Sequence, residues 1–328
     1  MKALFQRVYG AASSLVLEDL PRPVPGEGEV LVRVRASSVN PYDWHFMRGE
    51  PYVARLMPGG FGLRPPGGIL GCDLAGRVET AGSRFGPGDD VYALLPQGAH
   101  AEYVCVREDL LAPMPVNLTY EQAAAMPMAA VTALLALRGV EAGQRVLVNG
   151  ASGGVGTFAV QLARALGARV DAVCSAANAS TARSLGADHV FDYRTEDFTR
   201  SGRRYDVVLD VAGSRSVFAC RRVLAHGGTF VAVGGPAGRW VQPAGHVFAA
   251  LASGLFARRR VVLADAVACQ DKAAVLAELT ALVESGAVTP VVDRTYPFDD
   301  LRAAFAYQEA GHAGGKVVVT LGVPGGAA

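Results

Sequence analysis

The chain has 328 residues, of which 51% are hydrophobic and 19% are charged, and its formal net charge is +1 at pH 7. This composition is typical of a globular protein with room for one large or two medium domains. A nearly neutral chain offers no basic surface, so we expect no nucleic-acid partner. No apolar run is long enough to span a bilayer, and the first ten residues contain no apolar signal core. We therefore expect no membrane partner and a cytoplasmic location.

The first third of the chain is β-rich. Alternating apolar residues predict strands near 30–34, 76–80, 90–95 and 102–106, separated by turns rich in glycine and proline. The pattern becomes helical over 119–137, where Pro127 interrupts it. Five widely spaced cysteines without a CxxC pair are expected to be free thiols.

Strands and helices alternate after residue 144, which predicts a parallel sheet with right-handed crossovers. The predicted strands cover 146–148, 169–174, 189–193, 205–209, 228–233 and 261–263, and the predicted helices cover 155–166, 179–185 and 216–224. The tail predicts helices over 271–285 and 298–310, an extended piece around residue 291, and a strand over 315–319.

The first strand of this alternating region runs into a glycine turn and then a helix. The segment RVLVNGASGGVG spans 145–156 and places glycines at 150, 153, 154 and 156. Strand, glycine turn and helix together are the setting of a dinucleotide site, because the backbone and the helix N-terminus can approach a pyrophosphate. An ordinary glycine turn is the alternative. Thr157 and Phe158 follow, where a nucleotide triphosphatase loop would carry GK[ST].

The end of the next strand indicates which dinucleotide is bound. An Asp or Glu there would bind the free 2′-hydroxyl of NAD(H). This chain carries Ser175, nineteen residues after Gly156, while Asp171 lies at the other end of the strand. Ser175 and Asn178 can donate hydrogen bonds to a 2′-phosphate, which favours NADP(H) as cofactor. A helix cap is the alternative or additional role of Ser175.

Seven segments, in order, resemble the medium-chain dehydrogenase/reductase superfamily, and within it the zinc-free quinone oxidoreductase and enone reductase branch. They lie at 36–49, 70–82, 87–104, 123–134, 145–168, 184–193 and 310–319. The resemblance implies an α/β fold, in which a Rossmann doubly wound parallel sheet is inserted into a discontinuous GroES-like β-barrel domain. The implied boundaries are 1–120 and 265–328 for the catalytic domain and 121–264 for the NADP-binding domain. A small-molecule substrate and a homodimer are expected.

The chain departs from the zinc-dependent members of the superfamily. Those members carry a Cys where this chain has Asn40, and His-Glu where it has Cys72-Asp73. One thiol and one carboxylate do not make the three protein ligands of a catalytic zinc site, so no metal is expected. Without a Lewis acid, reduction of a conjugated C=C bond or of a quinone is favoured over alcohol oxidation.

The resemblance also implies a set of cofactor-binding residues. Those near the pyrophosphate are Ser152, Gly153, Gly154 and Val155, those around the 2′-phosphate are Ser175, Asn178 and Tyr193, those near the nicotinamide are Thr132, Val233 and Gly234, and those at the cofactor edge are His312 and Lys316. Structural roles are the alternatives for several of them. Thr132 could bond its own helix backbone, Tyr193 could be a strand-end aromatic, and Lys316 could be a strand-edge charge.

The loop from Asn40 to Tyr52 is the candidate for the substrate side. It concentrates polar and aromatic side chains, and Asn40, Tyr42 and His45 are the candidate catalytic residues. Side-chain-to-backbone bonds that hold the loop are the structural alternative. Residues 247–256 could form an apolar lid. Three functions stay open: an NADPH-dependent reductase of an alkene or quinone, a zinc-free carbonyl reductase, and a nucleotide-binding regulatory protein without turnover.

Overall fold

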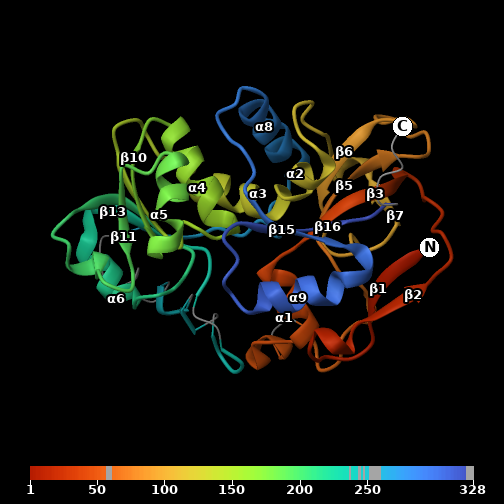
Figure 1. Ribbon diagram of the computed structural model, residues 1–328, viewed down its shortest axis with the longest axis horizontal. Helices are drawn as coiled ribbons and strands as arrows, with labels where there is room; N and C mark the ends of the chain where they lie inside the picture. The colour runs from red at the N-terminus through yellow and green to blue at the C-terminus, as the bar shows by residue number, and fades with distance from the viewer. Residues whose placement is uncertain (57–60, 236–237, 243–244, 247, 251–259, 323–328) are drawn as a thin grey trace.

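Two lobes lie side by side along the long axis of the molecule (Figure 1). The computed structural model describes residues 1–56, 61–235, 238–242, 245–246, 248–250 and 260–322. One lobe contains a parallel sheet built from residues 145–263. The other contains antiparallel strands from residues 2–113, together with two strands from residues 292–320. The second lobe is therefore discontinuous in sequence.

The parallel sheet has six strands in the order β11-β10-β9-β12-β13-β14. Their bounds are β9 Arg145–Asn149, β10 Arg169–Cys174, β11 His189–Asp192, β12 Tyr205–Asp210, β13 Leu224–Ala232 and β14 Arg260–Leu263. The strand order reverses between β9 and β12. That switch point is where a doubly wound sheet opens its ligand crevice, beyond the carboxyl ends of the strands. The Rossmann fold expected from the sequence is confirmed.

The helices of this lobe are α4 (Gly154–Ala165), α5 (Ala179–Ser184) and α6 (Val217–Cys220). Helix α4 is buried all round over residues 156–163, and Gly167 follows it with a φ of 79°. Helices commonly end at a residue in this left-handed conformation, which glycine adopts without a Cβ clash. The helix expected over 216–224 is wrong in length. A 3₁₀ turn follows α6, and Leu224 already belongs to β13.

The other lobe contains two sheets. A small one has the order β2-β1-β4, and a larger one has the order β15-β16-β3-β5-β6-β8, with β7 also paired to β3. The bounds are β1 Lys2–Gln6, β2 Val16–Asp19, β3 Glu29–Val39, β4 Gly68–Ile69, β5 Asp73–Val78, β6 Asp90–Leu94, β7 Tyr103–Arg107, β8 Leu111–Pro113, β15 Val292–Pro297 and β16 Lys316–Thr320. Strands β1, β2, β4 and β8 were not predicted. All four are short, and β2 is buried on neither face.

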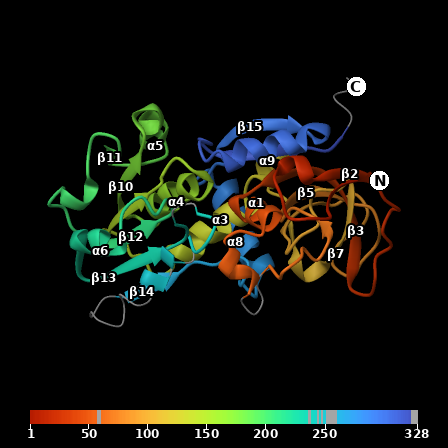
Figure 2. The ribbon, with the colours of Figure 1, turned by 90° about the horizontal axis from the view of Figure 1, so that it is seen from below.

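Helix α3 (Pro127–Ala136) connects the two lobes. Nine of its ten residues are buried, as a helix that is hydrophobic all round requires. It packs against α4 on one side and against β5 and β6 on the other, and both views place it near the middle of the molecule (Figures 1 and 2). Helix α2 (Tyr120–Ala124) precedes it, so the helical stretch divides at Pro127 as predicted.

Two further helices cover the antiparallel lobe. Helix α8 (Lys272–Glu284) packs against β8 and α3, and α9 (Leu301–Glu309) packs against α1 (Pro41–Arg48) and β16. Within the part of the chain that the structure describes, no helix combines the length and apolarity that crossing a membrane would need.

Candidate active site

The glycine turn lies between β9 and α4, as predicted. Gly150 has a φ of 94°, and Gly153 is the N-cap of α4. A Cβ on Gly156 would lie 2.1 Å from the carbonyl oxygen of Gly150, so packing of the helix on its own turn demands glycine there. A Cβ on Gly153 would meet nothing closer than 3.7 Å. The protein itself therefore does not require glycine at 153, whereas a ligand at the helix N-terminus would.

Several predicted cofactor residues follow the carboxyl ends of neighbouring parallel strands. Ser175 follows β10, Tyr193 follows β11, and Val233 with Gly234 follow β13, so all of them lie at the edge of the sheet where the glycine turn also lies. A Cβ on Gly234 would lie 2.4 Å from the carbonyl oxygen of Val211. Glycine there permits the close approach of two strand ends beside the crevice.

Ser175 and Asn178 are next to each other in space. Asn178 Nδ2 donates to Ser175 Oγ at 3.4 Å, and Ser175 is buried while Tyr193 is 44% exposed. Ser175 precedes the 3₁₀ turn 176–178, but its side chain makes no capping bond. Its Oγ is therefore not consumed by the cap that was the alternative to phosphate binding.

The loop between α9 and β16 reaches the same edge from the other lobe. A Cβ on Gly314 would lie 3.4 Å from Asn178 Oδ1, so this loop contacts the parallel-sheet lobe directly. His312 is exposed on the loop. The structure thus brings His312, Asn178 and Ser175 into one region, although they come from segments more than a hundred residues apart.

The segment after β3 forms a helix, so the expectation of a loop over 40–52 is wrong. Helix α1 spans Pro41–Arg48, with Asn40 as N-cap and Gly49 ending it at a φ of 60°. Pro at the first position and glycine after the last are the usual marks of helix ends. Asp43 in the first turn accepts a hydrogen bond from the Asn40 backbone N–H at 2.7 Å.

Asn40 belongs to a buried polar network between the lobes. Its Nδ2 donates to Asp73 Oδ2 at 3.0 Å, and its Oδ1 accepts from Lys316 Nζ at 2.5 Å. Lys316 Nζ also donates to Asp73 Oδ2 at 3.0 Å. Asp73 accepts two further bonds, from Ser38 Oγ at 2.7 Å and from the backbone N–H of Met128 at 2.8 Å. A buried ion pair of this kind persists because every polar partner is satisfied.

Lys316 joins this network to the glycine turn. Its side chain is 3% exposed, and a Cβ on Gly154 would lie 2.9 Å from Lys316 Cδ. The methylene chain therefore passes the N-terminus of α4, and the ammonium group ends at Asn40 and Asp73. A strand-edge surface charge, the structural alternative for Lys316, does not describe this position.

The two other candidate catalytic residues lie on α1. The Tyr42 ring packs against Phe46 with centroids 4.8 Å apart, and burial raises the pKa of Tyr42 well above its usual range. His45 Nδ1 lies 2.8 Å from the carbonyl oxygen of Glu50, which can only accept, so Nδ1 carries the proton. Burial lowers the pKa of His45, which keeps the imidazole neutral at pH 7.

Thr132 is buried on α3, and its Oγ1 donates to the carbonyl of Met128 at 2.6 Å. The hydroxyl proton thus bonds the helix backbone, as the structural alternative stated, and the oxygen retains its acceptor capacity. The lid proposed over 247–256 falls partly outside the described residues, because these exclude 247 and 251–256.

The three positions that differ from the zinc-dependent enzymes carry side chains that already have partners. Burial and the carboxyls of Asp43 and Asp73 raise the pKa of the Cys72 thiol well above its usual range. The Asp73 carboxylate already accepts four hydrogen bonds, and both polar ends of the Asn40 side chain are occupied. The donor set therefore does not suit zinc.

Two buried carboxyls were not among the predicted site residues. Asp43 is fully buried, and burial raises its pKa to about 7 despite the hydrogen bond from Asn40. Asp73 was noticed only as a departure from a zinc-ligand pattern, and its ion pair with Lys316 spans 243 residues of sequence. The sequence near Asp73 gave one indication of its role: Asp73 is a carboxylate within the apolar strand β5, and a buried charge needs a partner.

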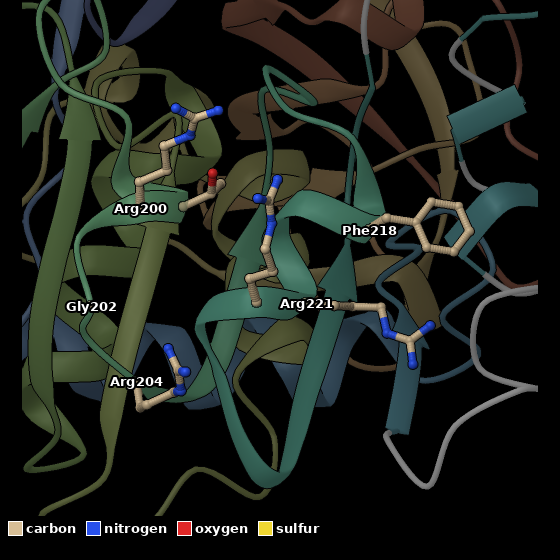
Figure 3. Close-up of a pocket in the computed structure, with 7 residues that line it drawn as sticks. Arg200, Gly202, Arg204, Phe218 and Arg221 are labelled. Carbon is tan, nitrogen blue, oxygen red and sulfur yellow. The ribbon is translucent and has the colours of Figure 1, made fainter.

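A surface pocket of about 510 Å³ lies at the opposite edge of the parallel sheet. Its lining residues are Thr199, Arg200, Gly202, Arg204, Phe218, Arg221 and Arg222 (Figure 3). They come from the segments that lead into the amino ends of β12 and β13. Because ligands of such sheets bind at the carboxyl ends, this pocket is separate from the candidate site.

Comparison with known proteins places nearly the whole chain among dehydrogenases and oxidoreductases. Residues 26–116 match the alcohol dehydrogenase GroES-like domain family, and residues 185–319 match the zinc-binding dehydrogenase family. A chloroplast envelope quinone oxidoreductase homolog of Arabidopsis thaliana is 33% identical over 341 residues, covering 97% of this chain and 98% of that protein. An NADPH-dependent alkenal/one oxidoreductase of Arabidopsis thaliana is 35% identical, covering 97% of this chain and 79% of that protein.

A solved structure agrees with these relatives. The quinone oxidoreductase from Coxiella burnetii superposes with a TM-score of 0.83 at 29% identity, covering 98% of this chain and 99% of that chain. Both lobes are therefore shared with that enzyme. The chain belongs to the medium-chain dehydrogenase/reductase superfamily, in the branch that contains the quinone oxidoreductases and the alkenal/one oxidoreductases.

Proposed function

We propose that this protein is an NADPH-dependent reductase of an activated carbon–carbon double bond or of a quinone. The observation that carries the proposal is the carboxyl edge of the parallel strands, where sheets of this kind open a ligand crevice. This edge contains the glycine turn, and a buried polar network lies beside it. Relatives named as quinone oxidoreductase and alkenal/one oxidoreductase support the same reaction class.

The cofactor would lie along this crevice. The residues that we propose to bind it are Thr132, Ser152, Gly153, Gly154, Val155, Ser175, Asn178, Tyr193, Val233, Gly234 and His312. Lys316 would line the cofactor site only through its methylene chain beside Gly154, because its ammonium group bonds Asn40 and Asp73. The N-terminus of α4 suits a pyrophosphate, because its N–H groups point away from the helix and a Cβ on Gly153 would meet nothing closer than 3.7 Å. Ser175 and Asn178 offer donors where a 2′-phosphate would lie, and Ser175 stands at the strand end where an Asp or Glu would favour NAD(H). When bound, the reduced nicotinamide supplies a hydride.

The substrate would meet the cofactor beside Asn40, Tyr42 and His45. One N–H of the Asn40 amide is not used by Asp73, and it can donate to an oxygen that gains negative charge. Tyr42 is a protonated phenol at neutral pH and can return a proton. His45 is neutral and donates to a backbone carbonyl, so its contribution would be to position α1.

Zinc independence is part of the proposal. The protonated Cys72, the fully hydrogen-bonded Asp73 and the occupied Asn40 side chain support it. Chelation by EDTA should leave the rate unchanged, and elemental analysis should find less than one zinc per ten chains, on the order of adventitious metal. Stoichiometric zinc that is lost on replacing Cys72 would contradict this part.

We also propose domain boundaries at 120 and 264, a homodimer, and a cytoplasmic location. Strand β14 supports association through this sheet, because Leu263 is 42% exposed and, among the described strands, β14 pairs with β13 on one side only. Analytical ultracentrifugation tests the homodimer, and fractionation of cells tests the location.

NADPH consumption measured against enones, quinones and aldehydes tests the proposed reaction. We expect consumption with enones or quinones and a saturated ketone as the enone product. Allylic alcohol as the product would identify a carbonyl reductase, and NADPH binding without consumption would identify a protein without turnover.

A further inference from the structure

The side chain of Asn40 lies between two ions of opposite charge. Lys316 Nζ donates to its Oδ1 at 2.5 Å, and its Nδ2 donates to Asp73 Oδ2 at 3.0 Å. Asn40 and Lys316 are each 3% exposed, and Asp73 is 0% exposed. Water therefore does not compete for these bonds, and the full strength of charge-assisted hydrogen bonds is available.

Chemistry alone determines how this amide is turned. An ammonium group has donors only, and an ionised carboxylate has acceptors only. Rotation of the Asn40 amide by 180° would place NH₂ against the ammonium and oxygen against the carboxylate, so both bonds would become repulsive. One N–H of Asn40 remains after these bonds are made, and its direction is the same in every molecule.

The two ions are themselves held in place. Asp73 accepts from Ser38 Oγ on β3 and from the Met128 backbone N–H at the start of α3. Lys316 begins β16, and its methylene chain lies against the N-terminal glycine of α4, where a Cβ on Gly154 would approach Cδ to 2.9 Å. The amide is thus connected to elements of both lobes.

We propose that Lys316 and Asp73 are positioning residues that lock the Asn40 amide in one orientation and present its remaining N–H to the substrate oxygen. This inference rests on the proposed function, in which Asn40 lies on the substrate side. The ammonium group acts through Asn40 and does not touch the cofactor phosphates, which differs from the cofactor-edge role expected from the sequence.

Two variants distinguish an effect on the orientation of Asn40 from an effect on the stability of the fold. Lys316→Met leaves the buried Asp73 carboxylate without its counter-ion, and Lys316→Met/Asp73→Asn removes both charges. An amide at 73 can donate as well as accept, so Asn40 loses its fixed orientation in the double variant. We expect the double variant to recover much of the melting temperature that Lys316→Met loses, because no unpaired charge remains.

The rate should not recover with the stability. We expect kcat to fall roughly ten- to a hundredfold in both variants, in line with the loss of one oriented donor, with the NADPH Kd within about twofold of the native value. Recovery of kcat together with the melting temperature would show that the pair is only structural. A rise in the NADPH Kd that accounts for the lost activity would make Lys316 a cofactor ligand. Either result overturns the proposal.

A readout that needs no substrate keeps this test independent of the proposed reaction. The chain has four asparagines, Asn40, Asn117, Asn149 and Asn178, so ¹⁵N labelling of asparagine side chains gives four NH₂ signals. Asn40→Ala assigns the relevant signal. We expect Lys316→Met to shift the Asn40 signal and to speed its solvent exchange, whereas the control Lys272→Met leaves it unchanged.

An Asn40 signal that is unaffected by Lys316→Met would overturn the inference. If the signal responds but the native protein consumes no NADPH with any enone or quinone, the orientation lock is supported and the proposed function alone is wrong.

Discussion

Ser175 is the residue on which we expect the choice between NADPH and NADH to depend most. It is buried at the end of β10, with its Oγ beside Asn178 Nδ2 and without a capping bond. Ser175→Asp would put a carboxylate beside the 2′-phosphate, and two like charges in a partly buried site repel by several kcal/mol. We expect the NADPH Kd to rise at least roughly tenfold while the NADH Kd falls or stays equal.

Ser175→Ala is the matched control for this prediction. It removes one donor without adding charge, so the NADPH Kd should rise only about fivefold. Both constants can be measured by fluorescence titration. NADH binding as tight as NADPH binding in the native protein would contradict the assignment.

Tyr42 and His45 should contribute modestly to the rate. The loss of one hydrogen bond or one general acid lowers a rate roughly ten- to a hundredfold, so Tyr42→Phe is expected within that range. His45→Ala removes the bond to the Glu50 carbonyl and should cost about 1 kcal/mol of stability as well. Steady-state kinetics and thermal denaturation measure the two effects. If either variant were as inactive as a cofactor-binding variant while its NADPH affinity stayed normal, that residue would be an essential acid.

The sequence indicated Asn40 and Lys316 as separate site residues, but it gave no sign that their side chains are in contact. Periodicity carries no information about a contact between residues 276 positions apart, which only the packing of β16 beside β3 creates. The hydrogen bonds of Asp73 could not be predicted for the same reason, since its four donors come from three distant parts of the chain. The proximity of Ser175 and Asn178 was predictable, because both residues follow β10 closely in the sequence.

In helix α1, burial of Asp43 in the first turn lowers the stability of the fold by an amount that depends on pH. Burial raises the pKa of Asp43 to about 7 from an ordinary value near 3.8. Between those two pH values the folded state binds a proton that the unfolded state does not, so stability falls as pH rises from about 4 to about 7 and then levels off. The size of the effect is on the order of a few kcal/mol.

Asp43→Asn isolates this contribution. We expect the melting temperature of the variant to exceed that of the native protein increasingly from pH 4 to pH 7, with a constant difference above pH 8. Taking the difference between the two proteins removes the titration of all other carboxyls. A difference that does not change between pH 4 and pH 8 would show that Asp43 is ionised throughout.

The glycine turn before α4 combines a structural glycine with a functional one. Gly156→Ala would place a Cβ 2.1 Å from a backbone oxygen and should destabilise the fold by several kcal/mol, roughly as overpacking at a rigid backbone does. In Gly153→Val, the new Cβ would lie no closer than 3.7 Å to another protein atom, so the melting temperature should stay nearly unchanged. The side chain would occupy the place of the pyrophosphate, so NADPH binding should be abolished. Calorimetry and fluorescence titration on both variants test this difference. Loss of folding in Gly153→Val would contradict it.

Helices and strands with a clear apolar repeat in their sequence were predictable. Those that form only by pairing with another segment of the chain were not. The strands and helices from 145 to 210 were predicted within a few residues, because each contains an apolar run, and glycines mark the ends of β9, α4 and α5. Strands β1 and β2 lack that pattern and form by pairing with each other. Helix α1 was predicted as a loop because its aromatic and polar side chains obscured the signals at its ends, Asn40 with Pro41 and Gly49.

At the scale of the whole molecule, the candidate site exists only because two lobes meet. Helix α3 packs against α4 of one lobe and against β5 and β6 of the other, the loop before β16 reaches Asn178, and Lys316 links the start of α4 to Asn40 and Asp73. The family resemblance predicted this arrangement of a Rossmann sheet within a discontinuous second domain. Composition and periodicity alone predicted the parallel sheet but gave no relative placement of the lobes.

Transfer of deuterium from [4-²H]NADPH to an enone is the decisive measurement of the proposed reaction, because it follows the hydride to its acceptor carbon. We expect a saturated ketone with one deuterium on the carbon β to the carbonyl, and with the hydrogen on the α carbon taken from solvent. Mass spectrometry and NMR of the product distinguish the two positions. An allylic alcohol labelled on the carbonyl carbon, or NADPH that is bound but never consumed with any enone or quinone, would contradict it.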